Sequence, residues 1–260
     1  MSRTLLIDGD TMIFEATAAN EYEQQWDHWL WTLHALFEPA VAHFKDAVET
    51  LTAKLKADRV ILALSDEERW RPKVMPMYKS NRVKTRKPIT YKPLRDWCHD
   101  VYETFQRPTL EGDDVLGILA THPKLVKGEK IVVSIDKDMK TIPGVHLNYA
   151  EARGSDDYEQ FIRVIQRDEA DYYHLFQTLT GDKTDGYPGC PGIGPVNAEK
   201  LLTSGGFEPV RAWQVVVAAY AKKGLGEEVA LQNARVARIC RHTDYDFTKK
   251  EVKLWTPPKA

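Results

Sequence analysis

The sequence predicts an α/β protein in which helices cover a mostly parallel sheet. Three short apolar runs have the length and β-branched content of buried strands, and each ends in an aspartate: TLLID at Asp8, VILALSD at Asp66 and KIVVSID at Asp136. Helical patterns separate the strands, and such alternation is typical of parallel sheets. Ligands bind such sheets at the carboxyl ends of the strands, which is where the three aspartates fall.

The remaining elements of the first part follow from apolar spacing. Apolar residues recur at helical intervals from Leu33 to Leu55, and Pro39 interrupts them, which predicts two helices. We expect the tryptophans of this stretch to pack between helices; they are Trp26, Trp29 and Trp31. The apolar run VHLNY, residues 145–149, predicts a further strand.

The pattern of expected elements changes at about Gly181. Short helices are expected over residues 196–202, 208–221 and 227–241, joined by turns rich in glycine and proline. We therefore expect an α/β domain over residues 1–180 and a helical region over residues 181–260.

Composition bounds the class of protein. The 260 residues are 43% hydrophobic and 28% charged, as in ordinary globular proteins. No apolar run approaches the ~20 residues of a membrane helix, and the N-terminus MSRTLLIDGD is not a signal peptide. The three cysteines show no CxxC spacing. A cytoplasmic protein with free thiols and no membrane association is expected.

The net charge of −2 hides a strong asymmetry. Residues 69–95 contain ten Lys or Arg and no Asp or Glu, which leaves −12 for the rest of the chain. A basic segment on an acidic body indicates a polyanionic partner. Within it, MYKSNR brings together Tyr78, which could stack on an unpaired base, and Lys79 and Arg82, which could neutralise a phosphate. We expect a flexible arch near residues 67–95 that orders on DNA.

Acidic residues gather at strand ends and turns. Each motif alone is weak, because acids commonly cap helices. A converging group would repel strongly, since two carboxylates 4 Å apart cost about 4 kcal/mol at an effective dielectric near 20. Oxygen ligands without Cys or His favour Mg²⁺ or Mn²⁺, and two such ions can activate water against a phosphodiester. The candidate metal ligands are Asp8, Asp66, Glu111, Asp113, Asp114, Asp136, Asp138, Asp182 and Asp185.

The stretch PGCPGIGPVNAEKLL resembles the hairpin of helix-hairpin-helix DNA-binding elements. Its glycines permit positive φ and close backbone approach, and the following helix presents its N-terminus to a phosphate. Such an element grips the DNA backbone without reading sequence. The candidate DNA-binding residues are Gly189, Gly192, Ile193, Gly194, Val196, Asn197 and Lys200.

Six motifs in order resemble the bacteriophage 5′→3′ exonucleases and flap endonucleases, which are related to the 5′-nuclease domain of bacterial DNA polymerase I. The motifs are LLIDGD, ALSDEE, MYKSNR, EGDDVLG, VSIDKDMKTI and TGDKTDGYPGCPGIGPVNAEKLL. The resemblance implies a PIN-like domain, a helical arch, a helix-three-turn-helix element and cleavage of DNA with 5′ ends, flaps or branches. It also implies that the products carry a 5′-phosphate and a 3′-hydroxyl.

The resemblance further implies roles for individual residues. One metal site would use Asp8, Asp66, Glu111, Asp113, Asp114 and Asp136, and the second Asp138, Asp182 and Asp185, with Asp136 shared. Lys79 and Arg82 match the arch pair that positions the scissile phosphate. Asp10 stands where relatives often carry an uncharged residue, so we expect it to support the ligands. A potassium ion at the hairpin and replication proteins as partners are further implications.

Three alternatives remain open at this point. LIDGDTM approaches the nucleophile motif of haloacid-dehalogenase-like phosphatases, although Met12 replaces the Thr or Val of that motif and GDKTD is one residue too short. A non-catalytic module for branched DNA would use the same basic segment and hairpin. An RNA-directed PIN nuclease would share the fold.

Overall fold

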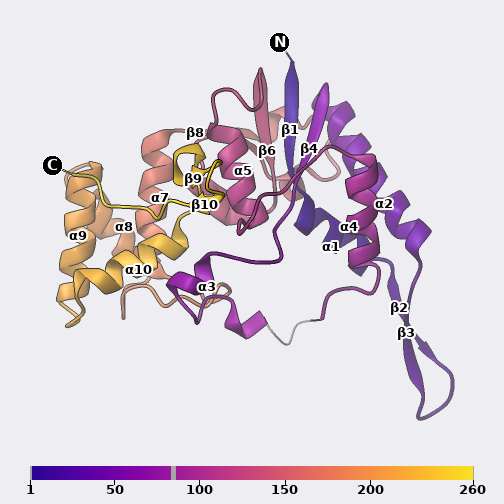
Figure 1. Ribbon diagram of the computed structural model, residues 1–260, viewed down its shortest axis with the longest axis horizontal. Helices are drawn as coiled ribbons and strands as arrows, with labels where there is room; N and C mark the ends of the chain where they lie inside the picture. Colours follow the sequence, from indigo (N-terminus) through magenta and orange to yellow (C-terminus); the bar gives the residue numbers. More distant parts are fainter. Residues whose placement is uncertain (1, 83–85, 260) are drawn as a thin grey trace.

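The computed structural model describes residues 2–82 and 86–259. A six-stranded sheet in the order β5-β4-β1-β6-β7-β8 forms its centre (Figure 1). The strands pair in parallel except for β8, which runs antiparallel to β7. The predicted α/β class and mostly parallel sheet are confirmed. The strands are β1 (Arg3–Asp8), β4 (Arg59–Ala63), β5 (Thr104–Phe105), β6 (Glu129–Val133), β7 (Gly144–Leu147) and β8 (Ile162–Ile165).

Side chains of β1 alternate between two apolar layers, as the period of a strand requires. Leu5 and Ile7 pack against α1 (Gly9–Ala18), α2 (Phe37–Lys54) and α4 (Tyr91–Val101). Leu6 points to the other face, which is covered by α5 (Gly112–Thr121). Because both faces are covered, β1 is almost entirely buried, and this explains its continuous apolar sequence.

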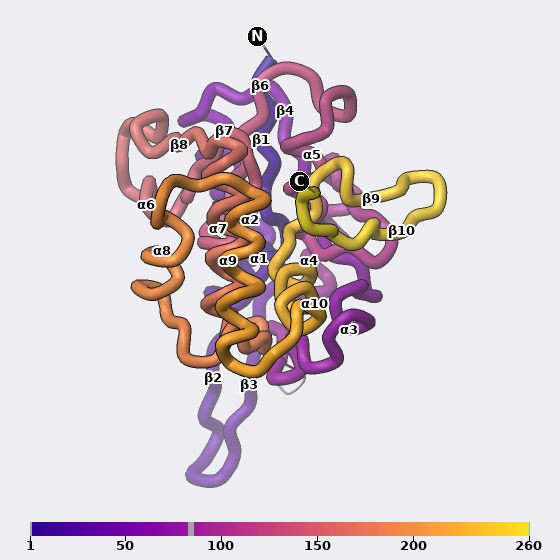
Figure 2. Tube along the Cα trace, turned by 90° about the vertical axis from the view of Figure 1, so that its left-hand side faces the viewer, coloured from indigo at the N-terminus to yellow at the C-terminus, as the bar shows by residue number. Residues whose placement is uncertain are grey.

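The C-terminal helices form a third apolar cluster beside the sheet (Figure 2). They are α7 (Arg167–Thr180), α8 (Pro195–Thr203), α9 (Pro209–Ala221) and α10 (Glu227–Ala237), so the predicted helices exist with small shifts of their ends. The last helix ends at Ala237 rather than residue 241, because the backbone after it bonds to Arg71 and Asp114. The boundary at residue 180 stays a prediction, since Leu175 and Leu179 of α7 pack with the helices that follow.

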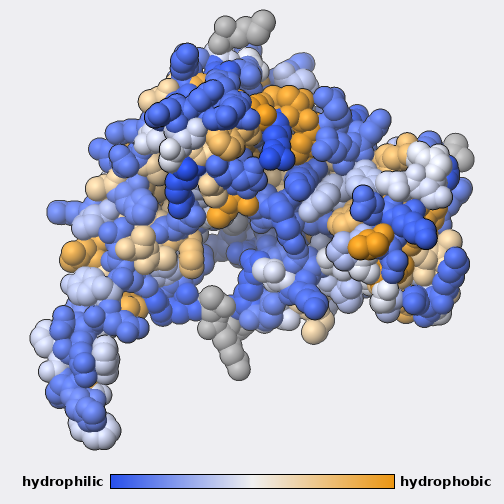
Figure 3. Space-filling model, turned by 180° about the vertical axis from the view of Figure 1, so that it is seen from behind, coloured by the Kyte–Doolittle hydropathy of each residue, from blue (hydrophilic) through white to orange (hydrophobic). Residues whose placement is uncertain are grey.

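Residues 21–35 form a β-hairpin, and the predicted separate helix beginning at Leu33 is wrong because residues up to Ala35 belong to its second strand. Strands β2 (Glu21–Gln25) and β3 (Trp31–Ala35) form a separate two-stranded sheet that stands off the body (Figures 1 and 3). Pro39 lies in the first turn of α2, where no backbone N–H is required, so it does not interrupt the helix. The expected packing of the tryptophans between helices is wrong: Trp26, Trp29 and Trp31 are all exposed, Trp29 to 88%.

The basic segment contains little regular structure before α4. It forms α3 (Arg71–Val74) and a 3-10 turn at η1 (Ser80–Arg82), and residues 83–85 of the predicted arch lie outside the described residues. The smaller elements are η2 (Lys137–Thr141), α6 (Tyr149–Ala152), η3 (Glu159–Phe161), η4 (His242–Asp244), β9 (Tyr245–Asp246) and β10 (Glu251–Val252).

Two further expectations concern single features. Cys98, Cys190 and Cys240 are buried free thiols. Within the described part of the chain, no helix has the length and apolar content needed to cross a membrane.

Candidate active site

Three parallel strands deliver aspartates to one edge of the sheet. Asp8 is the last residue of β1, while Asp66 and Asp136 each lie three residues beyond the end of β4 and β6. These three aspartates line one cavity of ≈ 670 Å³. Of the nine predicted metal ligands, six line this cavity: Asp8, Asp66, Glu111, Asp113, Asp136 and Asp185.

Asp8, Asp113 and Asp136 form a group of like charges. Burial raises the pKa of Asp8 to about 6, although its carboxylate accepts hydrogen bonds from Thr11 and, at 2.9 Å, from Ser134 Oγ. Burial, followed by the charges of Asp8 and Asp136, holds the pKa of Asp113 well above its usual range. A divalent cation would relieve this repulsion, so the donor set fits a hard metal ion.

A second acidic group surrounds Asp138. Burial, then the charge of Asp136, raises the pKa of Asp138 to about 7, and Gln177 Nε2 donates to its Oδ1 at 2.7 Å. Burial also opposes ionisation of Asp182, but a hydrogen bond from Lys137 Nζ at 2.8 Å helps to lower its pKa. The backbone N–H groups of residues 184 and 185 donate to the same carboxylate. Asp138 and Asp182 do not line the cavity.

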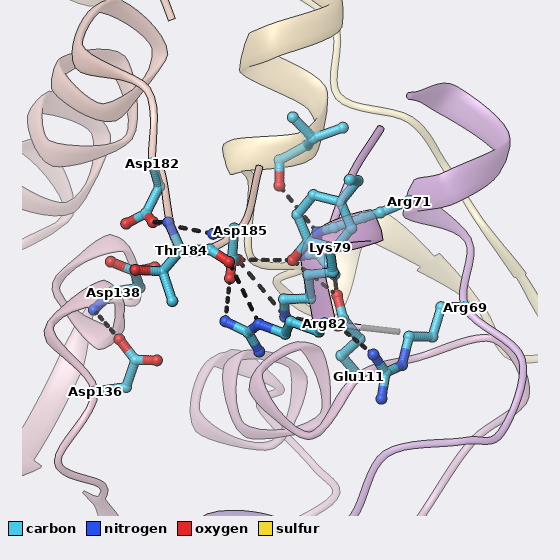
Figure 4. A network of polar contacts seen from close by, with 12 residues as sticks. Arg69, Arg71, Lys79, Arg82, Glu111, Asp136, Asp138, Asp182, Thr184 and Asp185 are labelled. Atoms are coloured by element: carbon cyan, nitrogen blue, oxygen red, sulfur yellow. Dashed lines mark hydrogen bonds and ion pairs between the residues drawn. The ribbon is translucent and has the colours of Figure 1, made fainter. Parts of the chain in front are cut away.

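The base of the arch carries Lys79 and Arg82, which lie beside Asp185 and Glu111 (Figure 4). Arg82 Nη2 donates to Asp185 Oδ1 at 2.6 Å, and the Tyr78 hydroxyl donates to Asp185 Oδ2 at 2.8 Å. Lys79 Nζ is 2.8 Å from Glu111 Oε1 and 3.6 Å from Asp185 Oδ2. Lys79 and Arg82 also line the cavity, so the predicted cationic pair faces the acidic wall.

Tyr78 does not have the environment expected of it. Only 5% of the residue is exposed, and its ring lies 5.7 Å from the guanidinium carbon of Arg71. The expected stacking of this ring on a base does not fit such burial. The hydroxyl group of Tyr78 instead donates to Asp185 and lies 3.2 Å from Glu111 Oε2.

Several of the acids form ion pairs with lysine or arginine side chains. Lys79 is paired with Glu111, Arg82 with Asp185 and Lys137 with Asp182. Across residues 2–82 and 86–259, no three His, Cys, Asp or Glu side chains are spaced as a ready-made metal site. A metal ion at Glu111, Asp182 or Asp185 would compete with these cationic side chains.

Three of the predicted residues have other contacts. Asp114 is completely buried, pairs with Arg71 and accepts a hydrogen bond from Trp70 Nε1 at 3.0 Å, so it faces away from the cavity. Asp10 lines the cavity and accepts from Ser65 N–H and the Tyr91 hydroxyl, as a supporting residue would. Asp66 accepts from Gln106 Nε2 and Thr109 N–H.

The predicted DNA-binding hairpin borders a separate groove of ≈ 520 Å³. Its lining includes four of the predicted residues, Gly192, Ile193, Asn197 and Lys200. Gly194 and Val196 are exposed nearby at the start of α8, Val196 to 79%. Gly189 is buried and its N–H donates to Asn233 Oδ1 at 3.0 Å, so that amide is not free for a phosphate.

Several residues of the cavity surroundings and the hairpin groove were not predicted from the sequence. Arg71 joins Glu111 to Asp114, and Lys137 and Gln177 hold the second acidic group. Arg211 and Lys223 add positive charge to the hairpin groove. The sequence held one signal for Arg71: residues 69–95 contain no Asp or Glu, so a buried arginine in this segment must pair with acids from other parts of the chain.

Residues 3–167 match the family described as 5′-3′ exonuclease, N-terminal resolvase-like domain. The chain belongs to this family. It is 31% identical to the exodeoxyribonuclease of Enterobacteria phage T3 over 97% of this chain and 92% of that protein. It is also 31% identical to the exonuclease of Escherichia phage T7, over 97% and 93% of the two chains. The flap endonuclease Xni of Vibrio campbellii is 31% identical over 74% of this chain and 76% of its own length.

Two solved structures share the fold. The T5 5′-exonuclease with bound zinc superposes with a TM-score of 0.66 over 90% of this chain and 89% of that one, at 15% identity. The catalytic core of Rad2 with DNA gives a TM-score of 0.52 over 99% of this chain and 84% of that one, at 12% identity. This family member is therefore a phosphodiesterase of the 5′-3′ exonuclease and flap endonuclease class, and the phosphatase and non-catalytic alternatives are set aside.

Proposed function

We propose that this nuclease hydrolyses phosphodiester bonds at 5′ ends, flaps or branches of DNA with the help of two divalent metal ions, leaving a 5′-phosphate and a 3′-hydroxyl. The juxtaposition in one cavity of mutually repelling carboxylates with Lys79 and Arg82 supports this proposal. Carboxylates bind hard metal cations, while the positively charged side chains of Lys79 and Arg82 can bind phosphate. Bound DNA and bound zinc in structures of the related T5 enzyme are consistent with it.

The placement of the acids suggests how the two ions are divided. The first would be held by the strand-end group, with Glu111 and Asp66 in reach of the same cavity. The second would be held by Asp138, Asp182 and Asp185, with Asp136 between the two groups. We leave Asp114 out of both sites because its carboxylate forms a buried ion pair with Arg71. When bound, the ions supply Lewis acidity and a water of lowered pKa; we propose Mg²⁺ or Mn²⁺ for both.

Lys79 and Arg82 would exchange partners during the reaction. Both are held by carboxylates. A scissile phosphate entering the cavity offers them a second anionic partner, to which arginine can bind through two parallel hydrogen bonds. Their positive charge then offsets the negative charge that develops on the phosphoryl oxygens.

The hairpin groove would hold the duplex away from the cleavage site. Lys200, Arg211 and Lys223 border it, and α8 begins beside it at Pro195 without a side-chain cap from Gly194. Contacts of this kind neutralise phosphates and are independent of sequence. The potassium ion at the hairpin, the choice of DNA over RNA and the replication partners stay predictions.

The test uses a duplex with a 5′ flap, labelled at its 3′ end and incubated with magnesium or with chelator. We expect shortening from the 5′ side or release at the junction only with magnesium. Asp138→Asn and Asp182→Asn should abolish cleavage while DNA binding in chelator is kept. Asp156→Asn changes an exposed acid that pairs with Lys54, far from the acidic groups of the site, and serves as the matched control. A double variant of Asp138 and Asp182 that still cleaves would contradict the metal assignment.

A further inference from the structure

Arg71 is a buried arginine whose guanidinium is fully hydrogen bonded at the base of the arch (Figure 4). Its Nη1 donates to Glu111 Oε2 at 2.6 Å and to Asp114 Oδ2 at 2.8 Å. Its Nη2 donates to Asp114 Oδ1 at 2.7 Å and to the Arg238 carbonyl at 2.7 Å. Its Nε donates to the Val236 carbonyl at 2.9 Å. All five guanidinium N–H groups are thus used in one fixed orientation.

These bonds set the orientation of the Glu111 carboxylate. Its Oε2 accepts from Arg71 Nη1, and the Tyr78 hydroxyl oxygen lies 3.2 Å from it. Its Oε1 is left for Lys79 Nζ, at 2.8 Å. Arg71 and Lys79 together lower the pKa of Glu111 to about 2, although burial opposes its ionisation. The carboxylate therefore presents one oxygen to Lys79 at the cavity wall and cannot rotate without breaking the contacts of the other.

The same side chain joins three segments that are distant in the sequence. Arg71 begins α3 at the base of the arch, Glu111 and Asp114 lie at the start of α5, and the two carbonyls lie at the end of α10. Helix α10 packs against α7 and α9 in the cluster that also contains α8. A single guanidinium thus connects the cavity wall with the helical group that borders the hairpin groove.

We propose that Arg71 is a positioning residue for the cleavage step. It holds Glu111 in one orientation and, through Glu111, places Lys79 Nζ where the scissile phosphate is bound. The inference rests on the proposed function, because it concerns the placement of the phosphate-binding lysine. Arg71 itself does not line the cavity, so it acts on the reaction only through its neighbours.

Lysine cannot reproduce these contacts. Its ammonium is a point charge with three donors, whereas the guanidinium spans two carboxylates and two carbonyls with a rigid fork. An Arg71→Lys variant should therefore keep the charge balance of the buried group but lose the fixed orientation. An Arg71→Gln variant should lose both.

The experiment compares steady-state cleavage of the 5′-flapped duplex at a temperature at which circular dichroism shows each variant folded. A displacement of about 1 Å at a reacting group can cost ~100-fold in rate, so we expect Arg71→Gln to lower kcat by about that factor and to leave KM within about threefold. Arg71→Lys should recover about tenfold of the loss. DNA affinity in chelator should be unchanged in both variants.

The matched control is Arg241→Gln. Arg241 is also a buried arginine, bonded to Asp171 at 2.7 Å and to the Thr141 carbonyl at 3.0 Å, but it touches none of the cavity acids. We expect it to lower the unfolding temperature while kcat stays within about threefold of the wild type. An equal loss of kcat in Arg71→Gln and Arg241→Gln would show that Arg71 is only a structural residue.

A double variant tests the route through Lys79. If Arg71 acts by placing Lys79, then Arg71→Gln should add little to the loss caused by Lys79→Ala, since the two changes disable one function. Independent, multiplying losses would overturn the proposal, as would an Arg71→Gln enzyme that keeps its kcat. If Arg71→Gln does not fold, the same cycle with Arg71→Lys decides. A wild-type protein without magnesium-dependent cleavage would instead contradict the proposed function.

Discussion

The loop from Gly181 to Gly189 carries Asp182 and Asp185, and its closure depends on two glycines. Gly181 ends α7 with φ 67° and ψ 179°, a conformation open almost only to glycine. A Cβ atom at Gly181 would lie 2.4 Å from the Pro188 carbonyl carbon and 2.6 Å from Gly189 N. We predict that Gly181→Ala destabilises the protein strongly and disturbs the second acidic group.

The magnitude follows from two contributions. The backbone conformation costs roughly 1–3 kcal/mol for a residue with a side chain. The overlap is with backbone atoms, which cannot rotate away as a side chain could, and crowding of this kind costs typically 1–3 kcal/mol more. The free energy of unfolding should therefore fall by roughly 2–6 kcal/mol, a large part of the 5–15 kcal/mol typical of folded proteins.

Urea unfolding followed by circular dichroism measures this change. Gly194→Ala is the control, because Gly194 has φ −90° and a Cβ there would meet no atom within 4 Å. Its unfolding free energy should change by less than about 1 kcal/mol. If Gly181→Ala costs less than about 1 kcal/mol, or no more than Gly194→Ala, the reasoning from backbone geometry is refuted.

Three other predictions concern the pH dependence of stability, the salt dependence of DNA binding and the exposed β2–β3 hairpin. Because burial raises the pKa of Asp138 to about 7, the unfolded chain releases this proton at lower pH than the folded one. The free energy of unfolding in chelator should therefore fall by about 3 kcal/mol between pH 4 and 7. Urea titrations of Asp138→Asn should show a shallower fall, and an unchanged slope would exclude this group as its source. Lys200→Ala and Lys223→Ala should each reduce the salt dependence of DNA binding by about one counterion, measured by fluorescence anisotropy from low to high salt; slopes equal to that of the wild type would remove the groove from the DNA path. Trp29→Ala should change the unfolding free energy by less than about 0.5 kcal/mol in urea, since the side chain is 88% exposed, and a larger loss would reveal packing that the structure lacks.

The strands and the cavity acids could be predicted because their signals are local. The run at β1 is apolar and β-branched, and Asp8 follows its last apolar residue. Parallel pairing then forces the ends of β1, β4 and β6 to the same edge of the sheet, so Asp66 and Asp136 could be placed beside Asp8. The start of α5 at Glu111 was equally readable from the acids that precede its apolar residues.

Other parts could not be predicted because they depend on partners far away in the chain. The stretch from Tyr22 to Leu33 has apolar residues that suit a helix or a strand, and only the observed pairing of Tyr22 with His34 and Gln25 with Trp31 decides for a hairpin. Asp114 reads as a metal ligand beside Asp113, yet it is claimed by Arg71, a residue 43 positions earlier.

The sequence by itself therefore determined the α/β class, the family and the set of acids at the strand ends, because strand period, helix spacing and motif order are properties of neighbouring residues. Only the tertiary structure decided which acids face the cavity, which cations cover them and that Arg71 lies at the centre of the arch base. The physical reason is burial: a charge removed from water must find its partners in space, and those partners lie on segments that the fold alone brings together.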